Sequence, residues 1–149
     1  MTVACEALLF MASRAQLTAE IVRPALNAGR VVVSDRFLLA NIVYQGHAGG
    51  LDPELLWTAG RIATEGLEPD LTLVLDLPVE AALARRKGSD DRFESRAPEY
   101  QARVREGFLR EARRHPDRLR VIDAGQSMEV VHERICQEVA RVLASGSRA

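Results

Sequence analysis

Two charged residues in the middle of this 149-residue sequence are the first candidates for chemistry. The segment VVVSDRFLLANIVYQG, which runs from Val31 to Gly46, places Asp35 and Arg36 directly after three valines. An arginine at the end of a buried strand can bind a phosphate through two parallel hydrogen bonds. An aspartate beside it can hold Mg²⁺ through water or orient a nucleophilic oxygen. An Asp-Arg ion pair that only caps the next turn is the structural alternative.

A second candidate pair lies near the N-terminus, in the stretch LLFMASRAQ. Phe10 and Arg14 are four residues apart, so a helix presents both side chains on one face. The ring can stack on a base while the guanidinium hydrogen-bonds the edge of that base. The alternative is that Phe10 belongs to the core and Arg14 is its solvated neighbour. Neither pair, taken alone, distinguishes a functional role from a structural one.

Helical spacing of apolar residues dominates the first half of the chain. It predicts one amphipathic helix, or two, from about Cys5 to Asn27, with a kink at Pro24. The continuously apolar run Val31–Val33 predicts a short strand that is covered on both faces. A second helix is expected to begin at Asp52, a good N-cap residue followed by proline, and to end near Gly66.

Strand and helix patterns alternate in the second half. Leu71–Leu77 predicts a strand that is apolar on both faces, and the helical stretch VEAALARRK follows it. A long helix is expected from about Pro98 to His115, then a strand in LRVIDA, then a last amphipathic helix from Met128 to Leu143. Together the elements predict an α/β fold: a doubly wound parallel sheet with helices on both faces and three recognisable strands. Ligands of such folds bind beyond the carboxyl ends of the strands, where Asp35 and Arg36 are expected to lie.

Length and composition exclude several classes of protein. The length fits a single domain over residues 1–149. Twenty Lys and Arg residues against twenty-one Asp and Glu residues give a formal net charge of −1, which argues against nucleic-acid binding. No apolar run approaches the roughly 20 residues that span a bilayer. Cys5 and Cys136 are isolated, which argues against a disulfide framework or a zinc site. A cytoplasmic protein is therefore expected.

Four stretches of the sequence, taken in order, resemble thymidylate kinases, the P-loop enzymes that transfer the terminal phosphoryl group of ATP to dTMP. They are EALLFMASRAQLTAEIVRPALNAG, VVVSDRFLLANIVYQG, PDLTLVLDLPVEAALAR, and GSDDRFE with the long helix and VIDA that follow it. Together they cover the chain from Glu6 to about Leu143. The resemblance implies a P-loop kinase type of fold and phosphorylation of dTMP to dTDP, with ATP as co-substrate and Mg²⁺ as cofactor.

The resemblance also implies a role for each residue of the two candidate pairs. Phe10 would stack on thymine and Arg14 would reach a carbonyl oxygen of the base. Asp35 would belong to the magnesium and phosphate network, holding the ion through water. Arg36 would bind the phosphate of dTMP and act with Asp35 in catalysis.

Further site residues are implied in the same way. Asn41 matches a position that hydrogen-bonds the thymine ring in some members, and Tyr44 matches one that packs on the deoxyribose and disfavours a 2′-hydroxyl. Gln45 lies beside them and has a less definite role. Arg92, in GSDDRFE, matches the lid arginine that stabilises the transferring phosphoryl group. The family is typically homodimeric, and the same is expected here.

One element that the resemblance requires does not occur in the 149 residues. No G-x-x-x-x-G-K-[ST] pattern is present. In the family, the strand that leads into this loop lies between the strands that VVVSD and LTLVLDL would form, so both would have unpaired edges here. We therefore expect the chain to be N-terminally incomplete, poorly active alone and marginally stable. The alternatives are a non-catalytic nucleotide-binding or dimerisation module and a kinase of another nucleotide such as dUMP.

Overall fold

The computed structural model describes residues 1–85 and 98–146, and its contacts divide the chain into two compact units. The first unit is Met1–Glu68 and the second is Pro69–Ala149. One domain was expected over residues 1–149, and the division falls between Glu68 and Pro69, ahead of the strand that begins at Thr72. Each unit is described by itself below.

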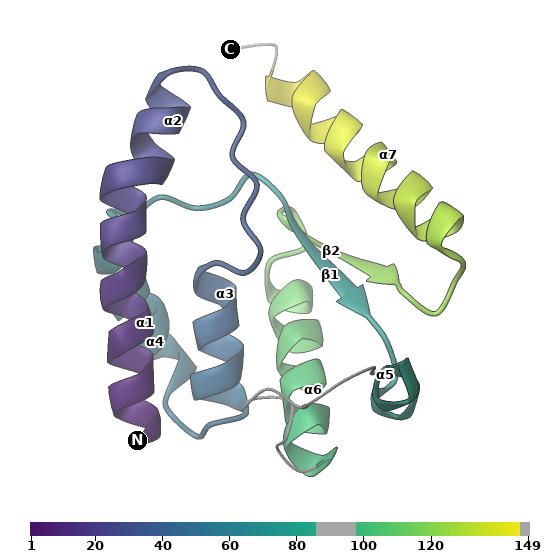
Figure 1. The fold of residues 1–149 in the computed structure, drawn as a ribbon, viewed down its shortest axis with the longest axis horizontal. Helices are drawn as coiled ribbons and strands as arrows, with labels where there is room; N and C mark the ends of the chain where they lie inside the picture. Colours follow the sequence, from purple (N-terminus) through teal and green to yellow (C-terminus); the bar gives the residue numbers. More distant parts are fainter. Residues whose placement is uncertain (86–97, 147–149) are drawn as a thin grey trace. The chain divides into compact units, whose positions relative to one another are not determined.

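A long helix opens the first unit. It consists of α1 (Val3–Leu17), a π-helical turn η1 (Thr18–Val22) and α2 (Arg23–Asn27), and Figure 1 shows them as one continuous rod. The expected kink at Pro24 takes the form of η1, in which the Arg23 N–H donates to the carbonyl of Thr18, five residues back. A proline ring clashes with the carbonyl four residues earlier in a regular α-helix, and the wider π-turn before it relieves that clash.

A second helical rod was not expected from the sequence. It comprises α3 (Leu38–Asn41) and the π-helix η2 (Ile42–His47). Its buried apolar residues have helical spacing, and they join residues of α1 and α4 in one core cluster. The members of that cluster are Ala7, Met11, Leu38, Ile42 and Leu56.

Helix α4 (Pro53–Ala63) completes the first unit and confirms the start expected from the sequence. The Asp52 side chain accepts a hydrogen bond from the backbone N–H of Glu54 at 2.8 Å, as an N-cap residue does. The helix ends three residues before Gly66, whose φ of 73° lies in the left-handed region. Within α4, Gly60 lets the helix approach α3 closely, because a Cβ there would lie 2.1 Å from Cδ1 of Leu38.

The prediction of a strand at Val31–Val33 is wrong. These residues have no regular secondary structure, and the side chains of Val31 and Val33 are 75% and 92% exposed. A strand exists only through hydrogen bonds to a neighbouring strand, and the described residues of the first unit contain none. The three valines therefore have the composition of a buried strand, but no strand of the described first unit pairs with them.

The second unit contains the only regular sheet among the described residues. Strands β1 (Thr72–Asp76) and β2 (Leu119–Asp123) are parallel, and their register pairs Thr72 with Leu119 and Asp76 with Asp123. Helix α6 (Pro98–Arg114) packs against both strands and α7 (Met128–Gly146) packs against β2. Figure 1 shows α6 and α7 on opposite sides of the strand pair. The expected α/β class, parallel pairing and helices on both faces are confirmed, with two strands in place of three.

The short helix α5 (Val79–Arg85) follows β1, as its sequence predicts. Helices α6 and α7 lie where their apolar periodicity places them, and Pro116 follows the end of α6. None of the helices in the described parts of the chain combines the length and the apolar character needed to cross a membrane.

Candidate functional site

Arg14 and Asn41 join the two sequence stretches that carry the predicted site. Helix α1 presents Arg14 and packs against both α3 and η2. The Arg14 guanidinium donates through Nη1 to Oδ1 of Asn41, 27 residues further along the chain. The same guanidinium lies over the ring of Phe37, with its carbon 5.4 Å from the ring centroid. Arg14 is thus held by an amide through one N–H group and by an aromatic ring through a cation–π contact.

Asn41 is itself fixed from two sides. Its side chain is buried, at 3% relative exposure, and its amide nitrogen donates to the Ala7 carbonyl at 3.5 Å. The amide group therefore spans α1 and α3 while it supports Arg14. Its predicted hydrogen bond to thymine stays a prediction, and in this structure its observed partners are protein atoms.

Burial lowers the pKa of Arg14 but leaves the guanidinium positively charged at neutral pH. Removal from water lowers the pKa of its guanidinium, because the charged form is less well solvated. The ordinary pKa of arginine is so high that the group stays cationic at neutral pH. Its carboxamide and aromatic neighbours carry no full negative charge, so an anionic or carbonyl ligand would find a cation that is not paired with a carboxylate of the described residues.

Arg36 also rests on an aromatic ring. Its guanidinium carbon lies 5.2 Å from the centroid of the Tyr44 ring, which η2 contributes. The backbone of Arg36 has a φ of 66°, in the left-handed region, and the Ser34 hydroxyl donates to its carbonyl at 2.9 Å. A non-glycine residue pays about 1 to 2 kcal/mol for that conformation. Such strain is concentrated at functional sites, so it supports the role proposed for Arg36 below.

Gln45 faces the interior. Its side chain is 1% exposed and its amide donates to Oε2 of the buried Glu6 at 3.3 Å. A direct contact between Gln45 and a substrate would require that hydrogen bond to be replaced. The structure gives Gln45 a buried position bonded to Glu6, and its substrate-binding role stays a prediction.

The remaining predicted residues are Phe10, Asp35 and Arg92. Phe10 is 41% exposed and is one helical turn from Arg14 on α1. Asp35 is exposed, next to Arg36. Arg92 lies outside the described residues, and its predicted lid role stays a prediction.

Asp35 is the predicted magnesium ligand, and its surroundings allow a test of that assignment. The described residues contain no group of three or more His, Cys, Asp or Glu side chains that could hold a metal ion. A dedicated protein cage is therefore absent from this part of the chain. Mg²⁺ in nucleotide enzymes commonly uses one or two carboxylates together with substrate phosphates and water. One exposed carboxylate beside an arginine that is predicted to bind phosphate fits that type of coordination.

Sequence reasoning missed several polar contacts. Phe37 and Glu6 support site residues but carry no motif of their own. In the second unit, Arg105 of α6 binds Asp76 at the carboxyl end of β1 through two hydrogen bonds, of 2.7 and 2.8 Å. Arg85 donates to the Ala124 carbonyl at 2.9 Å. A bidentate pair such as Asp76 and Arg105 is not visible in a sequence, because its members are 29 residues apart.

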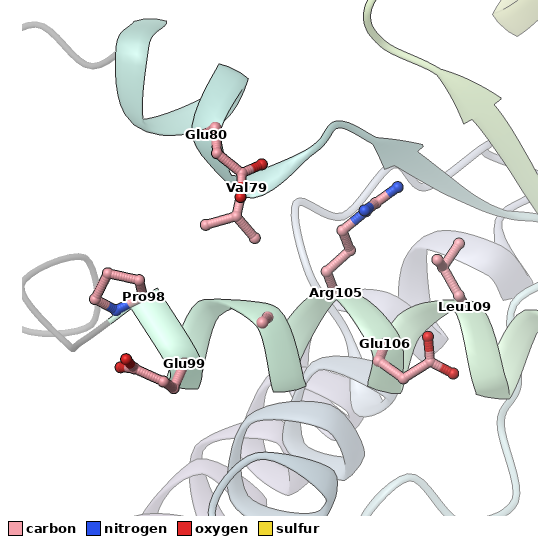
Figure 2. Close-up of a pocket in the computed structure, with 8 residues that line it drawn as sticks. Val79, Glu80, Pro98, Glu99, Arg105, Glu106 and Leu109 are labelled. Carbon is pink, nitrogen blue, oxygen red and sulfur yellow. The ribbon is translucent and has the colours of Figure 1, made fainter.

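Arg105 also borders a cavity of about 370 Å³ between α5 and α6. Figure 2 shows Arg105 reaching from α6 toward the end of β1. The cavity is lined by Val79, Glu80, Pro98, Glu99, Ala102, Arg105, Glu106 and Leu109. Three of these are acidic and the one cation is bound to Asp76, so the lining does not offer a site for phosphate.

Comparisons with known proteins agree with the family resemblance of the four sequence stretches. Residues 1–135 match a sequence model of the family described as thymidylate kinase. The thymidylate kinase of Symbiobacterium thermophilum is 49% identical over 144 residues, which cover 96% of this chain and 67% of that protein. The thymidylate kinase of Rhodopirellula baltica is 49% identical over 130 residues, which cover 87% of this chain and 53% of that protein.

A solved structure shows the same likeness in three dimensions. The crystal structure of thymidylate kinase from Ehrlichia chaffeensis superposes with a TM-score of 0.74 at 26% sequence identity, covering 94% of this chain and 66% of that one. The chain thus spans between about half and two thirds of the length of these three relatives.

Proposed function

Because the chain belongs to the thymidylate kinase family, we propose that the complete protein transfers a phosphoryl group from ATP to dTMP, forming dTDP. The structural observation that carries the proposal is the contact between Arg14 and Asn41. It brings together the two stretches to which the resemblance assigns dTMP recognition. Each of the two arginines in those stretches is further held by an aromatic ring.

The proposed site divides dTMP recognition among the residues of the first unit. Phe10 stacks on thymine, and the free N–H groups of Arg14 donate to a carbonyl oxygen of the base. Tyr44 packs on the deoxyribose. Arg36, held on Tyr44, binds the phosphate through two parallel N–H···O hydrogen bonds.

The phosphoryl-transfer step needs groups that neutralise negative charge. When bound, Mg²⁺ supplies positive charge between the phosphates, and Asp35 is the residue that would hold it, through water. Arg36 orients the phosphate that accepts the transferred group. Arg92 is proposed to stabilise charge on the equatorial oxygens of the transition state.

We also propose that the protein forms a homodimer through helices of the first unit. Large apolar side chains are exposed on α1 and α4, and two copies could cover them. Leu8, Leu9 and Leu17 on α1 are 67%, 56% and 42% exposed, Ile21 on η1 is 59% exposed, and Leu55 and Ile62 on α4 are 69% and 77% exposed. Where such side chains form a contiguous patch, they mark an interaction surface on a soluble protein.

Calorimetry and a coupled assay test the proposed activity. The 149-residue chain is titrated with dTMP, with the Arg36→Ala variant as the comparison. In parallel, the coding DNA upstream of the first codon is read in frame. If it encodes a G-x-x-x-x-G-K-[ST] loop, the extended protein should form dTDP from ATP and dTMP, and Arg36→Ala should nearly abolish that activity.

Two results would contradict the proposal. An extended protein that phosphorylates dTMP well after Arg36→Ala would show that Arg36 is not the phosphate ligand. Saturable dTMP binding without turnover, even with the loop present, would favour the alternative of a non-catalytic nucleotide-binding module.

A further inference from the structure

Phe37 is not among the residues assigned to dTMP above, yet its ring lies beside the residue proposed to read the base. Its ring lies under the Arg14 guanidinium, 5.4 Å from the guanidinium carbon. We propose that Phe37 is a positioning residue, which aims Arg14 so that the site prefers a pyrimidine with a carbonyl oxygen over one with an amino group. The inference rests on the proposed function, because it concerns the same dTMP site.

Two contacts restrict the guanidinium. Its carbon lies over the Phe37 ring, and Nη1 is directed to Oδ1 of Asn41. Arginine carries five N–H donors in one rigid plane, and Asn41 is the hydrogen-bond partner that the described residues provide. The donors that remain therefore have less freedom of direction before a ligand arrives. Preorganisation of this kind raises affinity because less side-chain entropy is lost on binding.

The backbone around Phe37 explains why this ring is available. Phe37 directly follows the strained residue Arg36 and is the last residue before α3, with φ −133° and ψ −148°. The left-handed conformation at Arg36 turns the backbone between the side chains of Arg36 and Phe37. One guanidinium then rests on Phe37 and the other on Tyr44, with both rings from the same helical rod or its cap.

The oriented donors favour one class of base edge. Thymine presents the O4 acceptor at the position where cytosine presents the N4 amino donor. A fixed set of N–H donors can bind the first and leaves the second without a hydrogen-bond partner. A guanidinium without its ring can rotate, so it would distinguish the two bases less well. Phe37 thus contributes to specificity without touching the substrate.

A packing role is the competing explanation. Phe37 is partly buried and packs against the cluster that contains Ala7, Met11 and Leu38. Loss of packing would weaken binding of every nucleotide to the same degree, since it would act through the stability of the unit. Only the orientation of Arg14 should change the ratio of affinities for two bases. That ratio is therefore the quantity to measure.

The experiment is a calorimetric titration of the full chain with dTMP and with dCMP. The unsubstituted protein should prefer dTMP. Phe37→Leu should weaken dTMP binding by about tenfold and change dCMP binding by less than about twofold. Phe37→Tyr keeps a ring and should retain the preference. Phe37→Met keeps much of the side-chain volume without a ring, and it replaces Phe37→Leu if circular dichroism shows the latter to be unfolded.

A double-mutant cycle links the effect to Arg14. Arg14→Gln should reduce the dTMP preference as Phe37→Leu does, and the combined variant should be little worse than either one. Equal losses for dTMP and dCMP in Phe37→Leu, or additive effects in the cycle, would make Phe37 a packing residue only. If the unsubstituted chain binds neither nucleotide, the proposed site is wrong and the inference falls with it. If it prefers dTMP and Phe37→Leu keeps that preference, the inference alone is wrong.

Discussion

Arg36 combines a strained backbone with a proposed role in phosphate binding. Its backbone adopts a φ of 66° that glycine would adopt without strain, and its guanidinium lies over Tyr44. The residue type therefore opposes the backbone conformation at this position. A side chain that is retained against such a preference is more readily explained by ligand binding than by folding.

Arg36 yields a prediction that separates binding from stability. Arg36→Ala should weaken dTMP binding by about 2 kcal/mol, or about thirtyfold in Kd, because a charge-assisted bidentate contact is lost. Binding of thymidine, which has no phosphate, should change little. Both affinities are measurable by calorimetry, and an equal loss for nucleotide and nucleoside would contradict the phosphate assignment.

Arg36→Gly provides the matched stability measurement. Glycine accepts the left-handed backbone, so the Gly variant should have a free energy of unfolding about 1 kcal/mol higher than the Ala variant. Urea unfolding followed by circular dichroism measures the difference. Equal stability of the two variants would show that the backbone at residue 36 is not strained.

Residue types indicated which side chains could belong to the site, but they did not indicate which neighbours those side chains contact. Arg14 and Arg36 are recognisable because arginines commonly bind phosphates and base edges, whereas Asn41 was implied by the resemblance to thymidylate kinases. The ring under Arg14 and the carboxylate beside Gln45 were not predicted. Phe37 and Glu6 have side chains whose role depends on residues that fold against them from distant parts of the chain.

At the scale of elements, the approach of α4 to α3 depends on a glycine. Gly60→Ala should destabilise the protein by about 1 to 3 kcal/mol, because the added Cβ would lie 2.1 Å from Cδ1 of Leu38 and the core would have to shift. Thr58→Ala, an exposed position on the same helix, is the control and should cost nothing. Chemical denaturation measures both. A stable Gly60→Ala variant would mean that the two helices can separate without cost.

The ion pair between β1 and α6 predicts a dependence of stability on pH. The hydrogen bonds from Arg105 lower the pKa of Asp76, so the carboxylate stays ionised in the folded protein at a pH where the unfolded chain is protonated. The stabilisation is therefore present above the unfolded pKa of about 4 and is lost as pH falls through the lowered value. With Arg105 39% exposed to solvent, we expect about 1 kcal/mol at neutral pH.

Asp76→Asn should remove this contribution. The difference in unfolding free energy between the parent and Asp76→Asn should be largest near pH 7 and should vanish at a pH well below 4. Since Asp123 and Glu129 also have lowered pKa values, the parent will depend on pH for other reasons, and the comparison isolates Asp76. A difference that stays constant with pH would contradict the assignment to an ion pair.

Elements were predictable where local patterns agree with tertiary contacts. The strands in LTLVLDL and LRVIDA and the helices α4, α6 and α7 follow from apolar spacing, caps and prolines. The helical rod over residues 38–47 was missed because its sequence follows three valines and is itself β-branched in part. The strand at Val31–Val33 failed for a different reason, because pairing is a property of two segments and sequence describes one at a time.

At the scale of the molecule, exposed apolar side chains on the first unit predict self-association. Leu8→Glu and Ile62→Glu should each shift the proposed dimer toward monomer by tenfold or more in dissociation constant, since a buried charge at an interface is costly. Met128→Glu is the matched control, because Met128 is 85% exposed on α7 of the second unit. Sedimentation equilibrium measures the constants. Equal effects of all three substitutions would contradict an interface on α1 and α4.

The valines at positions 31 to 33 have a consequence for handling the protein. A β-branched segment that lies outside regular secondary structure and exposes two of its three side chains can nucleate intermolecular cross-β assembly. Arg30 before it and Asp35 and Arg36 after it are charged and would repel or interrupt such stacking, as gatekeeper residues do. The arginine assigned to phosphate would then have a second effect, which is to keep concentrated solutions of this chain free of fibrils.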